Sequence, residues 1–312
     1  MKLNFMSNNC ILLTCDKAYL KAAWFVAWQL KFIPGLDADV VVCSGEDLGP
    51  VGSVGAMHRT IEMPGFIQHL PLNERLREFT YWRIPAIENL AKLYKRVLYL
   101  DTDLFVNSSR LPELFSLDMR GHAIAAVLDV HQSVRPKRQV AEFEALRLSH
   151  SSYFNAGVLL IDSKAWLAQG AYQRMVDLCE RHGHVLHRHD QSLLNLAFKD
   201  DWLELSPVWN WQYSYRNAFL TEWVSPQLIH FSGVRKPWHP PSGTIPRRYR
   251  ERYADFLRSL GEPVGDVAQV DEAPELAQQG KALLKCLWYF RAWSRYLSRF
   301  DTALTTVSHR RA

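Results

Sequence analysis

The chain has 312 residues, of which 48% are hydrophobic and 22% charged, a composition that excludes a disordered protein and is typical of one large or two smaller globular domains. The net charge of +5 is unevenly spread: residues 281–312 hold seven Lys/Arg and one acidic residue, which leaves thirty basic and thirty-one acidic residues before them. This balance gives no reason to expect nucleic acid as a partner of the body, and it indicates an anionic surface as a partner of the tail.

The cysteine pattern and the lack of long apolar runs indicate the cellular compartment. Five cysteines are scattered with neither disulfide nor zinc spacing, which is typical of a reducing compartment. No uncharged apolar run approaches the roughly 18 residues of a spanning helix, and residues 1–15 lack the pattern of a signal peptide. We therefore expect a cytoplasmic protein.

Strand-like and helical stretches alternate along the first half of the chain. Strands are expected at 10–15, 37–44, 96–100, 123–129 and 155–162, and helices at 19–31 and about 75–93. This alternation predicts an α/β sheet covered by helices on both faces. Ligands of such sheets bind at the carboxyl ends of the strands, where Asp101 and Asp129 fall.

The last third of the chain predicts a linker and a tail. Residues 261–275 contain Gly, Pro and acidic residues and are expected to link a domain over 1–260 to a tail over 276–312. Residues 281–300 predict an amphipathic helix with five Lys/Arg in one arc, into which Leu284 and Trp288 intrude, and an aromatic-rich opposite face. Such a helix is typical of an anionic membrane interface. The alternative is a helix docked on the protein's own surface.

Two aspartates one residue apart, Asp101 and Asp103, follow the strand at 96–100. Like charges at this spacing repel, and Mg²⁺ or Mn²⁺ is typically held by one or two carboxylates together with substrate phosphates. The pair therefore predicts a divalent-ion site. The structural alternative is a solvated turn that caps a helix near Ser108. A chemical alternative is a phosphatase of the haloacid-dehalogenase type, although Phe105 stands where those enzymes usually carry Thr or Val.

A second stretch, "PQLIHFSGVRKPWHPP" over 226–241, offers groups that suit a metal and a phosphate. His230 ends an apolar strand and can present an imidazole nitrogen to a metal ion. Gly233 allows close approach of the backbone to a phosphate, and Lys236 supplies a positive charge.

Two further stretches place amides and a carboxylate near the sheet. In "SSYFNAGVLLIDSKAW" (151–166), Asn155 precedes a buried strand and can bind hydroxyl groups at the sheet margin. In "HRHDQSLLNLAF" (187–198), Asp190 is expected to be a helix N-cap with Gln191 in the first turn.

These four stretches, in this order, resemble the retaining family 8 glycosyltransferases over roughly residues 10–240. The resemblance implies a single Rossmann-like nucleotide-sugar-binding domain of the GT-A type, with a mixed, mostly parallel sheet. It also implies Mn²⁺, with Mg²⁺ as an alternative, bound by Asp101, Asp103 and His230. The remaining site residues that it implies are Thr14, Asp16, Tyr19, Arg83, Thr102, Asp129, Gly233 and Lys236 for the nucleotide sugar, and Asn155, Asp190 and Gln191 around the transferred sugar.

Two departures from the family pattern stand out. The family's Asp-Gln-Asp is Asp190-Gln191-Ser192 here, and its early Asp-Asn pair is Asp16-Lys17. Neither removes a metal ligand.

The resemblance implies a UDP-sugar-dependent hexosyltransferase that moves galactose or glucose to a glycan or glycolipid acceptor of the lipopolysaccharide kind. With the basic tail, it predicts a peripheral protein on the inner face of the cell membrane. A non-catalytic, membrane-attached carbohydrate-binding protein is the third alternative.

Overall fold

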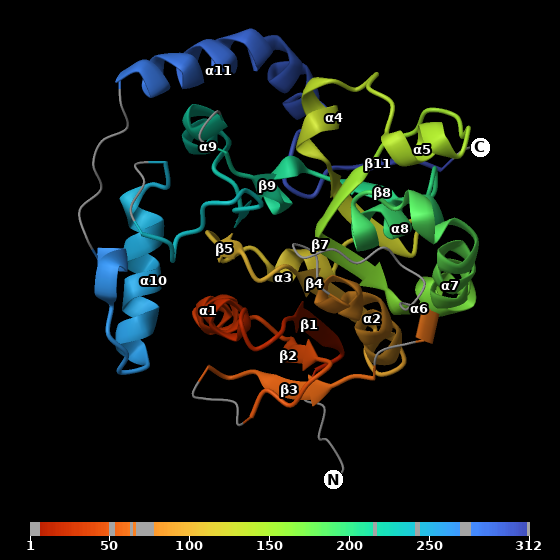
Figure 1. Cartoon of the computed structure of the whole chain (residues 1–312), viewed down its shortest axis with the longest axis horizontal. Helices are drawn as coiled ribbons and strands as arrows, with labels where there is room; N and C mark the ends of the chain where they lie inside the picture. Colours follow the sequence, from red (N-terminus) through yellow and green to blue (C-terminus); the bar gives the residue numbers. More distant parts are fainter. Residues whose placement is uncertain are drawn as a thin grey trace.

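The computed structural model describes residues 7–49, 54–62, 65–66, 78–214, 217–240, 244–268 and 276–310. The strands in these residues are β1 Asn9–Thr14, β2 Asp39–Ser44, β3 Met57–Thr60, β4 Arg96–Leu100, β5 Leu104–Val106, β6 Ile124–Leu128, β7 Phe154–Asp162, β8 Leu203–Leu205, β9 Trp211–Gln212, β10 Leu228–His230 and β11 Thr306–Ser308. They form an eight-stranded sheet in the order β11-β8-β6-β7-β4-β1-β2-β3 and a three-stranded sheet in the order β5-β10-β9 (Figure 1).

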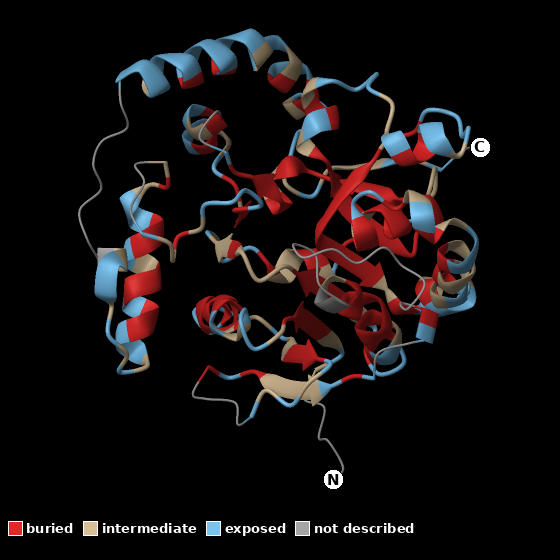
Figure 2. Cartoon of the chain, in the orientation of Figure 1, coloured by how far each residue is buried: buried red, intermediate tan, exposed pale blue. Residues whose placement is uncertain are grey.

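Helices cover both faces of the large sheet. The α-helices are α1 Leu20–Leu30, α2 Arg83–Ala91, α3 Pro112–Phe115, α4 Val130–Val134, α5 Ala141–Ala145, α6 Ser163–Ala168, α7 Ala171–His182, α8 His189–Ala197, α9 Ala218–Val224, α10 Arg247–Ser259 and α11 Leu276–Leu297. Alternate residues of β1 point to opposite faces, so Ile11 packs in a core with α1 and α10, whereas Leu12 packs in a core with α2, α7 and α8. Figure 2 shows the buried residues concentrated in the sheet and on the sides of the helices that face it.

The α/β class and the mixed, mostly parallel sheet are confirmed. Strands β1, β2, β3 and β4 run parallel, while β7 runs antiparallel to both of its neighbours. The expected helix at 75–93 is a 3₁₀ turn over Glu78–Trp82 followed by α2, and residues 75–77 lie outside the described residues.

A register change in β7 opens the sheet where the site residues lie. Ala126 of β6 pairs with Leu159, but Val127 pairs with Asn155, so residues 156–158 have no partner in β6. On the other side, the Asp101 amide donates to the Gly157 carbonyl at 2.8 Å. The first residues of β7 are therefore fixed to the end of β4, while the backbone of Ala156 bonds to the side chains of Gln191 and Arg83 in place of β6.

The tail docks on the body through its aromatic face, the face expected to meet a membrane. The α11 side chains Cys286, Trp293 and Tyr296 are buried against the core, and α11 contacts α4 and α9. Trp293 and Tyr296 belong to the aromatic face, and the ring centroid of Trp293 lies 5.2 Å from that of Trp211. The intruding Leu284 and Trp288 are instead 67% and 82% exposed.

The end of the chain adds an edge strand to the large sheet. β11 pairs antiparallel with β8, whose Glu204 is fully buried. Two side chains face this carboxylate: Arg299 donates to it at 2.7 Å, and His309 Nε2 lies 2.7 Å from it. The boundaries at 260 and 275 stay a prediction, but β11 contributes to the same sheet as β1.

All five cysteines are buried and free of disulfide bonds. Among the described helices, none combines the length and the apolar character needed to cross a bilayer.

The buried carboxylate yields a prediction about stability. Replacing Arg299 by Ala leaves Glu204 with only His309 beside it in a water-poor site, so we expect the free energy of unfolding to fall by about 2 kcal/mol, less than for a fully buried pair because Arg299 is partly exposed. Urea denaturation measures this, with Arg295→Ala as the control on an exposed position of α11. Equal stability of the two variants would contradict it.

Candidate metal and nucleotide-sugar site

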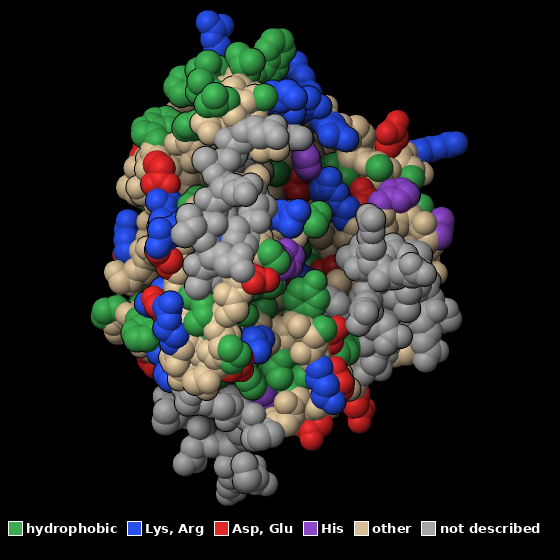
Figure 3. All heavy atoms as spheres, turned by 60° about the vertical axis from the view of Figure 1, so that its left-hand side comes forward, with side chains coloured by type: hydrophobic (Ala, Val, Ile, Leu, Met, Phe, Trp, Pro, Cys, Tyr) green, Lys and Arg blue, Asp and Glu red, His purple; other side chains and the backbone are tan. Residues whose placement is uncertain are grey.

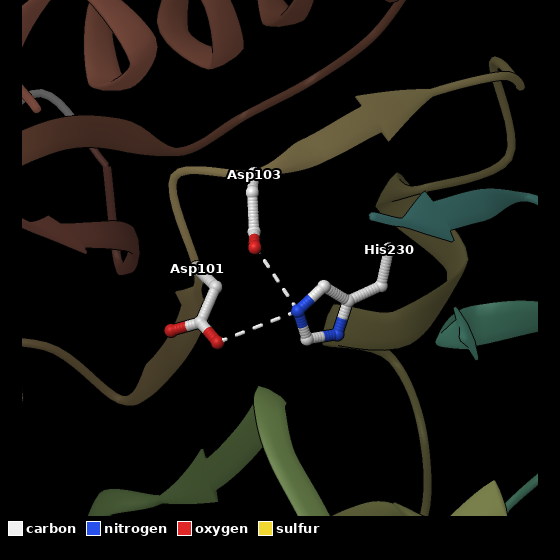
Figure 4. A group of neighbouring side chains, drawn as sticks. All are labelled: Asp101, Asp103 and His230. Carbon is white, nitrogen blue, oxygen red and sulfur yellow. Dashed lines mark ion pairs between the residues drawn. The ribbon is translucent and has the colours of Figure 1, made fainter. Parts of the chain in front are cut away.

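Three electron-rich side chains meet where β4 ends and the small sheet begins (Figure 4). His230 Nε2 lies 3.0 Å from Asp103 Oδ1 and 3.7 Å from Asp101 Oδ2. The three residues each offer a ligand atom, and these atoms all lie within 4.8 Å of one another. The convergence follows from strand pairing, because β10 pairs antiparallel with β5 and sets His230 opposite Leu104, the residue after Asp103.

A chain of hydrogen bonds selects one tautomer of the neutral His230 imidazole. Asn155 Oδ1 accepts from the Gly157 amide at 3.0 Å and from Asn210 Nδ2 at 2.8 Å. The Asn210 amide group is therefore oriented with Oδ1 toward His230 Nδ1, at 3.0 Å, so that Nδ1 carries the proton and donates. Nε2 is left with a lone pair directed at the two carboxylates.

The residues fit a divalent ion. Asp103 Oδ1 is buried and accepts no hydrogen bond, although it lies 3.0 Å from Nε2. Two acceptor atoms so placed repel unless a cation lies between them, and ligand atoms on an ion with bonds of about 2.1 Å are separated by about 3 Å. Burial raises the pKa of Asp103, but the charges of His230, when protonated, and of Lys236 outweigh burial and hold the pKa well below its usual range. Asp103 is thus available as an anionic ligand, with Lys236 Nζ 2.5 Å from its other oxygen.

Arg83 links the metal-ligand side of the site to the α8 side. Its guanidinium lies 3.0 Å from Asp101 Oδ1 and 2.8 Å from Asp190 Oδ2, and donates to the Ala156 carbonyl at 2.7 Å. Its Cζ lies 4.4 Å from the centroid of the Tyr99 ring, whose hydroxyl donates to Asp101 at 2.7 Å. One buried cation therefore fixes two carboxylates that would otherwise repel.

Asp190 is not the helix N-cap that the sequence predicts. Helix α8 begins at His189, so Asp190 lies in its first turn and points to Arg83. Burial raises the pKa of Asp190 to about 6, the Arg83 charge lowers it, and Asp101 raises it again. The expectation fails because the helix starts two residues earlier, at His189, with Arg188 at the N-cap position.

Gln191 is held by its neighbours on both sides. Its Oε1 accepts from the Ala156 amide at 3.1 Å and from Asn155 Nδ2 at 3.3 Å, while its Nε2 donates to Asp129 Oδ2 at 3.4 Å. Asp129 also caps α4, accepting from the His131 amide, and receives a 2.9 Å contact from Arg188. The amide oxygen of Gln191 is therefore already engaged.

A cavity of about 510 Å³ brings most of the predicted site together. Twelve of the fourteen residues line it: Thr14, Tyr19, Arg83, Asp101, Thr102, Asp103, Asp129, Asn155, Asp190, Gln191, His230 and Lys236. Asp16 lies outside the lining and accepts a hydrogen bond from the Tyr19 amide at 3.0 Å. Gly233 lines a neighbouring cavity instead.

Sequence reasoning missed several residues of the site. Asn210 stands in an aromatic run, "PVWNW", that carries no recognisable signal, and its role depends on a strand pairing between β9 and β10. Gln212 lines the cavity and accepts from the Val130 amide at 2.9 Å. Arg188 lies in the predicted "HRHDQSLLN" stretch and could have been found as a cation two residues before Asp190.

The sequence model of Glycosyl transferase family 8 matches residues 45–241, and the chain belongs to this family. General stress protein A of Bacillus subtilis is 28% identical over 217 residues, covering 63% of this chain and 72% of that protein. Lipopolysaccharide 1,2-glucosyltransferase of Escherichia coli is 30% identical over 172 residues, and glycosyltransferase GlyF of Streptococcus pneumoniae 32% over 166. The matches span 51% of this chain in both cases, but only 49% and 37% of those two relatives.

Solved structures share the fold. The galactosyltransferase LgtC, in complex with donor and acceptor sugar analogues, superposes with a TM-score of 0.62 at 22% identity, over 80% of this chain and 99% of that one. GlyE of Streptococcus pneumoniae gives 0.54 at 20% identity, over 80% and 63%. This likeness confirms the GT-A type of fold.

The hydrogen-bond relay predicts that Asn210 controls metal affinity without touching a metal. Replacing Asn210 by Ala removes the acceptor that keeps the proton on His230 Nδ1, so we expect Mn²⁺ to bind about 10- to 100-fold more weakly. Calorimetric titration with Mn²⁺ measures the change, with Asn9→Ala as the control outside the cavity. Unchanged Mn²⁺ affinity in a folded Asn210→Ala protein would refute the relay.

Proposed function

We propose that this chain is a retaining hexosyltransferase that moves galactose or glucose from a UDP-sugar to a glycan acceptor. The observation that carries the proposal is the buried, unpartnered oxygen of Asp103 facing the lone pair of His230, with Asp101 beside them. Asp101, Asp103 and His230 would hold Mn²⁺, with Mg²⁺ as an alternative. Such an ion supplies Lewis acidity that neutralises the charge developing on a departing diphosphate.

The chain's own side chains support the same chemistry. Lys236 extends into the cavity beside Asp103 and is close enough to turn toward a diphosphate oxygen. Thr14, Tyr19 and Thr102 line the cavity on the side of β1 and are assigned to the nucleotide. Arg83, held by Asp101 and Asp190, keeps its charge at a fixed place and would orient the nucleotide sugar.

The surroundings of Gln191 favour attack of the acceptor from the face that the diphosphate leaves. A double displacement needs a nucleophile on the opposite face, usually a carboxylate. The amide oxygen of Gln191 is a weak nucleophile and already accepts two hydrogen bonds. We assign Gln191, Asp190 and Asn155 to holding the transferred sugar, with Asp129 and Arg188 fixing Gln191 from behind.

The alternatives find less support in the site. A phosphatase of the haloacid-dehalogenase type would use Asp101 as its nucleophile, but Asp101 Oδ1 is held by Tyr99 and Arg83. A non-catalytic carbohydrate-binding protein would not need a metal-ligand set complete with a relay that orients its histidine.

Binding of UDP tests the proposal. We expect calorimetry to show UDP binding in Mn²⁺ that weakens at least about 50-fold in EDTA and in the Asp103→Asn variant, because the diphosphate then loses its main counter-charge. Asp118→Asn, which changes an exposed aspartate, should bind as the parent does. Metal-independent UDP binding, or none at all, would overturn the proposal.

The proposal also names the kind of acceptor and a membrane surface that the protein contacts. The similarity to a lipopolysaccharide 1,2-glucosyltransferase supports a lipopolysaccharide or lipooligosaccharide core as acceptor.

Apolar side chains on the outer side of α11 and on α9 are exposed, namely Leu276, Leu284, Leu287, Trp288, Phe219 and Trp223. Figure 3 shows hydrophobic side chains gathered at the top of the molecule, over α11, with Lys and Arg beside them. We assign this surface to peripheral attachment on the inner face of an anionic membrane.

Charge placed on this surface tests the attachment. The double variant Leu284→Glu/Trp288→Glu should sediment at least several-fold less with phosphatidylglycerol vesicles, because it loses apolar contact and adds repulsion. Point variants are preferable to deleting 276–312, which would also strip Arg299 and His309 from Glu204.

The matched control is Leu93→Glu/Leu167→Glu, which makes the same charge change at exposed leucines away from α11. Equal sedimentation of the two double variants would reject the membrane role of α11.

A further inference from the structure

A second cavity, of about 580 Å³, lies beside the first. The two share four lining residues: Val130, His131, Gln212 and Ser232. The walls of the second cavity come from α4 and the residues after it, from β9 and the residues after it, from the loop after β10, and from one face of α11. A molecule seated there would reach the first cavity past the residues that the two have in common.

The second cavity is lined by cations without anionic partners. Arg135, Arg138 and Lys285 line it, and no Asp or Glu is among its lining residues in the described part of the chain. Arg135 donates to the Tyr289 hydroxyl at 2.7 Å, and none of the three cations forms an ion pair with a described carboxylate. Several other surface arginines of the body are paired with carboxylates, as in Arg110–Glu113 and Arg248–Glu222. The positive charge here is therefore left for a ligand.

Aromatic rings complete the lining and suit a carbohydrate. Tyr213, Tyr289 and Trp293 line the second cavity, and such rings offer flat apolar surfaces with a polar edge, on which sugar rings can pack. Trp293 is fixed by its contact with Trp211, so this wall is rigid. Rings together with unpaired cations favour a sugar that bears negative charge over a neutral sugar or an apolar molecule.

We propose that the second cavity binds the acceptor, and that the acceptor is a glycan carrying a phosphate or carboxylate group held by Arg135, Arg138 and Lys285. This inference rests on the proposed function, because an acceptor site has meaning only beside a donor site. It makes α11 a wall of the acceptor site in addition to any contact with a membrane. The acceptor hydroxyl enters the first cavity past His131 and Gln212, while the anionic group stays in the second.

The test compares a charged and a neutral sugar on the full chain. With the donor site saturated by UDP and Mn²⁺, saturation-transfer NMR measures the Kd of glucose 6-phosphate and of glucose. We expect the phosphate ester to bind at least about tenfold more tightly, and its advantage to shrink as salt is added. The double variant Arg135→Gln/Lys285→Gln should lose most of this advantage.

The matched control is Arg291→Gln/Arg295→Gln, which removes two exposed cations of α11 that line neither cavity. It should keep the preference for glucose 6-phosphate. Equal binding of the two sugars by the parent chain, or the same loss in both double variants, would overturn the inference.

Two further measurements distinguish a failure of this inference from a failure of the proposed function and from lipid binding. UDP binding is measured by calorimetry on the same samples, so a failure of the proposed function shows as absent metal-dependent UDP binding, whereas a failure of this inference leaves UDP binding intact. Sedimentation with phosphatidylglycerol vesicles is measured in parallel. If Arg135→Gln/Lys285→Gln loses vesicle binding but keeps its preference for the sugar phosphate, the two cations serve lipid headgroups, and the inference is wrong.

Discussion

The structure depends on a partly buried concentration of negative charge at the end of β4. Asp101 and Asp103 are both partly removed from bulk water, and His230 Nε2 is directed at the same point. Such a group is stable only with cations around it. Arg83 and Lys236 supply two of them from opposite sides, and the space between the carboxylates and the imidazole suits a third.

The remaining architecture keeps this charged point rigid. The small sheet has its β5 strand immediately after the aspartates and its β10 strand ending in His230, so pairing of the two strands brings the ligands together, with the Phe231 amide donating to the Asp103 carbonyl. Gly157 is required because a Cβ there would lie 2.2 Å from His230 Cε1. The Gly157 amide orients the Asn155 side chain, Asn155 in turn orients Asn210, and Asn210 orients the His230 imidazole through a hydrogen bond to Nδ1.

Much of this could be predicted from the sequence, because strand patterns and the residues that end a strand are local features. The five expected strands, and the positions of Asp101 and Asp129 at strand ends, follow from apolar runs of four to eight residues. What could not be predicted depends on pairing between distant segments: the link of Asn210 to His230 crosses twenty residues. Local signals were also overridden, as at Asp190, where a salt bridge to Arg83 replaces the expected cap.

The tail shows the same limit of local patterns and explains why a helix so far along the chain matters to the site. Its helical wheel has two apolar surfaces, and the sequence alone does not say which of them the body covers. The contacts with α4 and Trp211 decide it, and the β11–β8 pairing anchors the end of the chain through Glu204. Helix α11 contacts α4, which begins directly after Asp129, and Asp129 accepts from Gln191 in the first cavity. A helix that only tethered the protein would not need this contact, whereas a helix that forms part of the proposed acceptor site would.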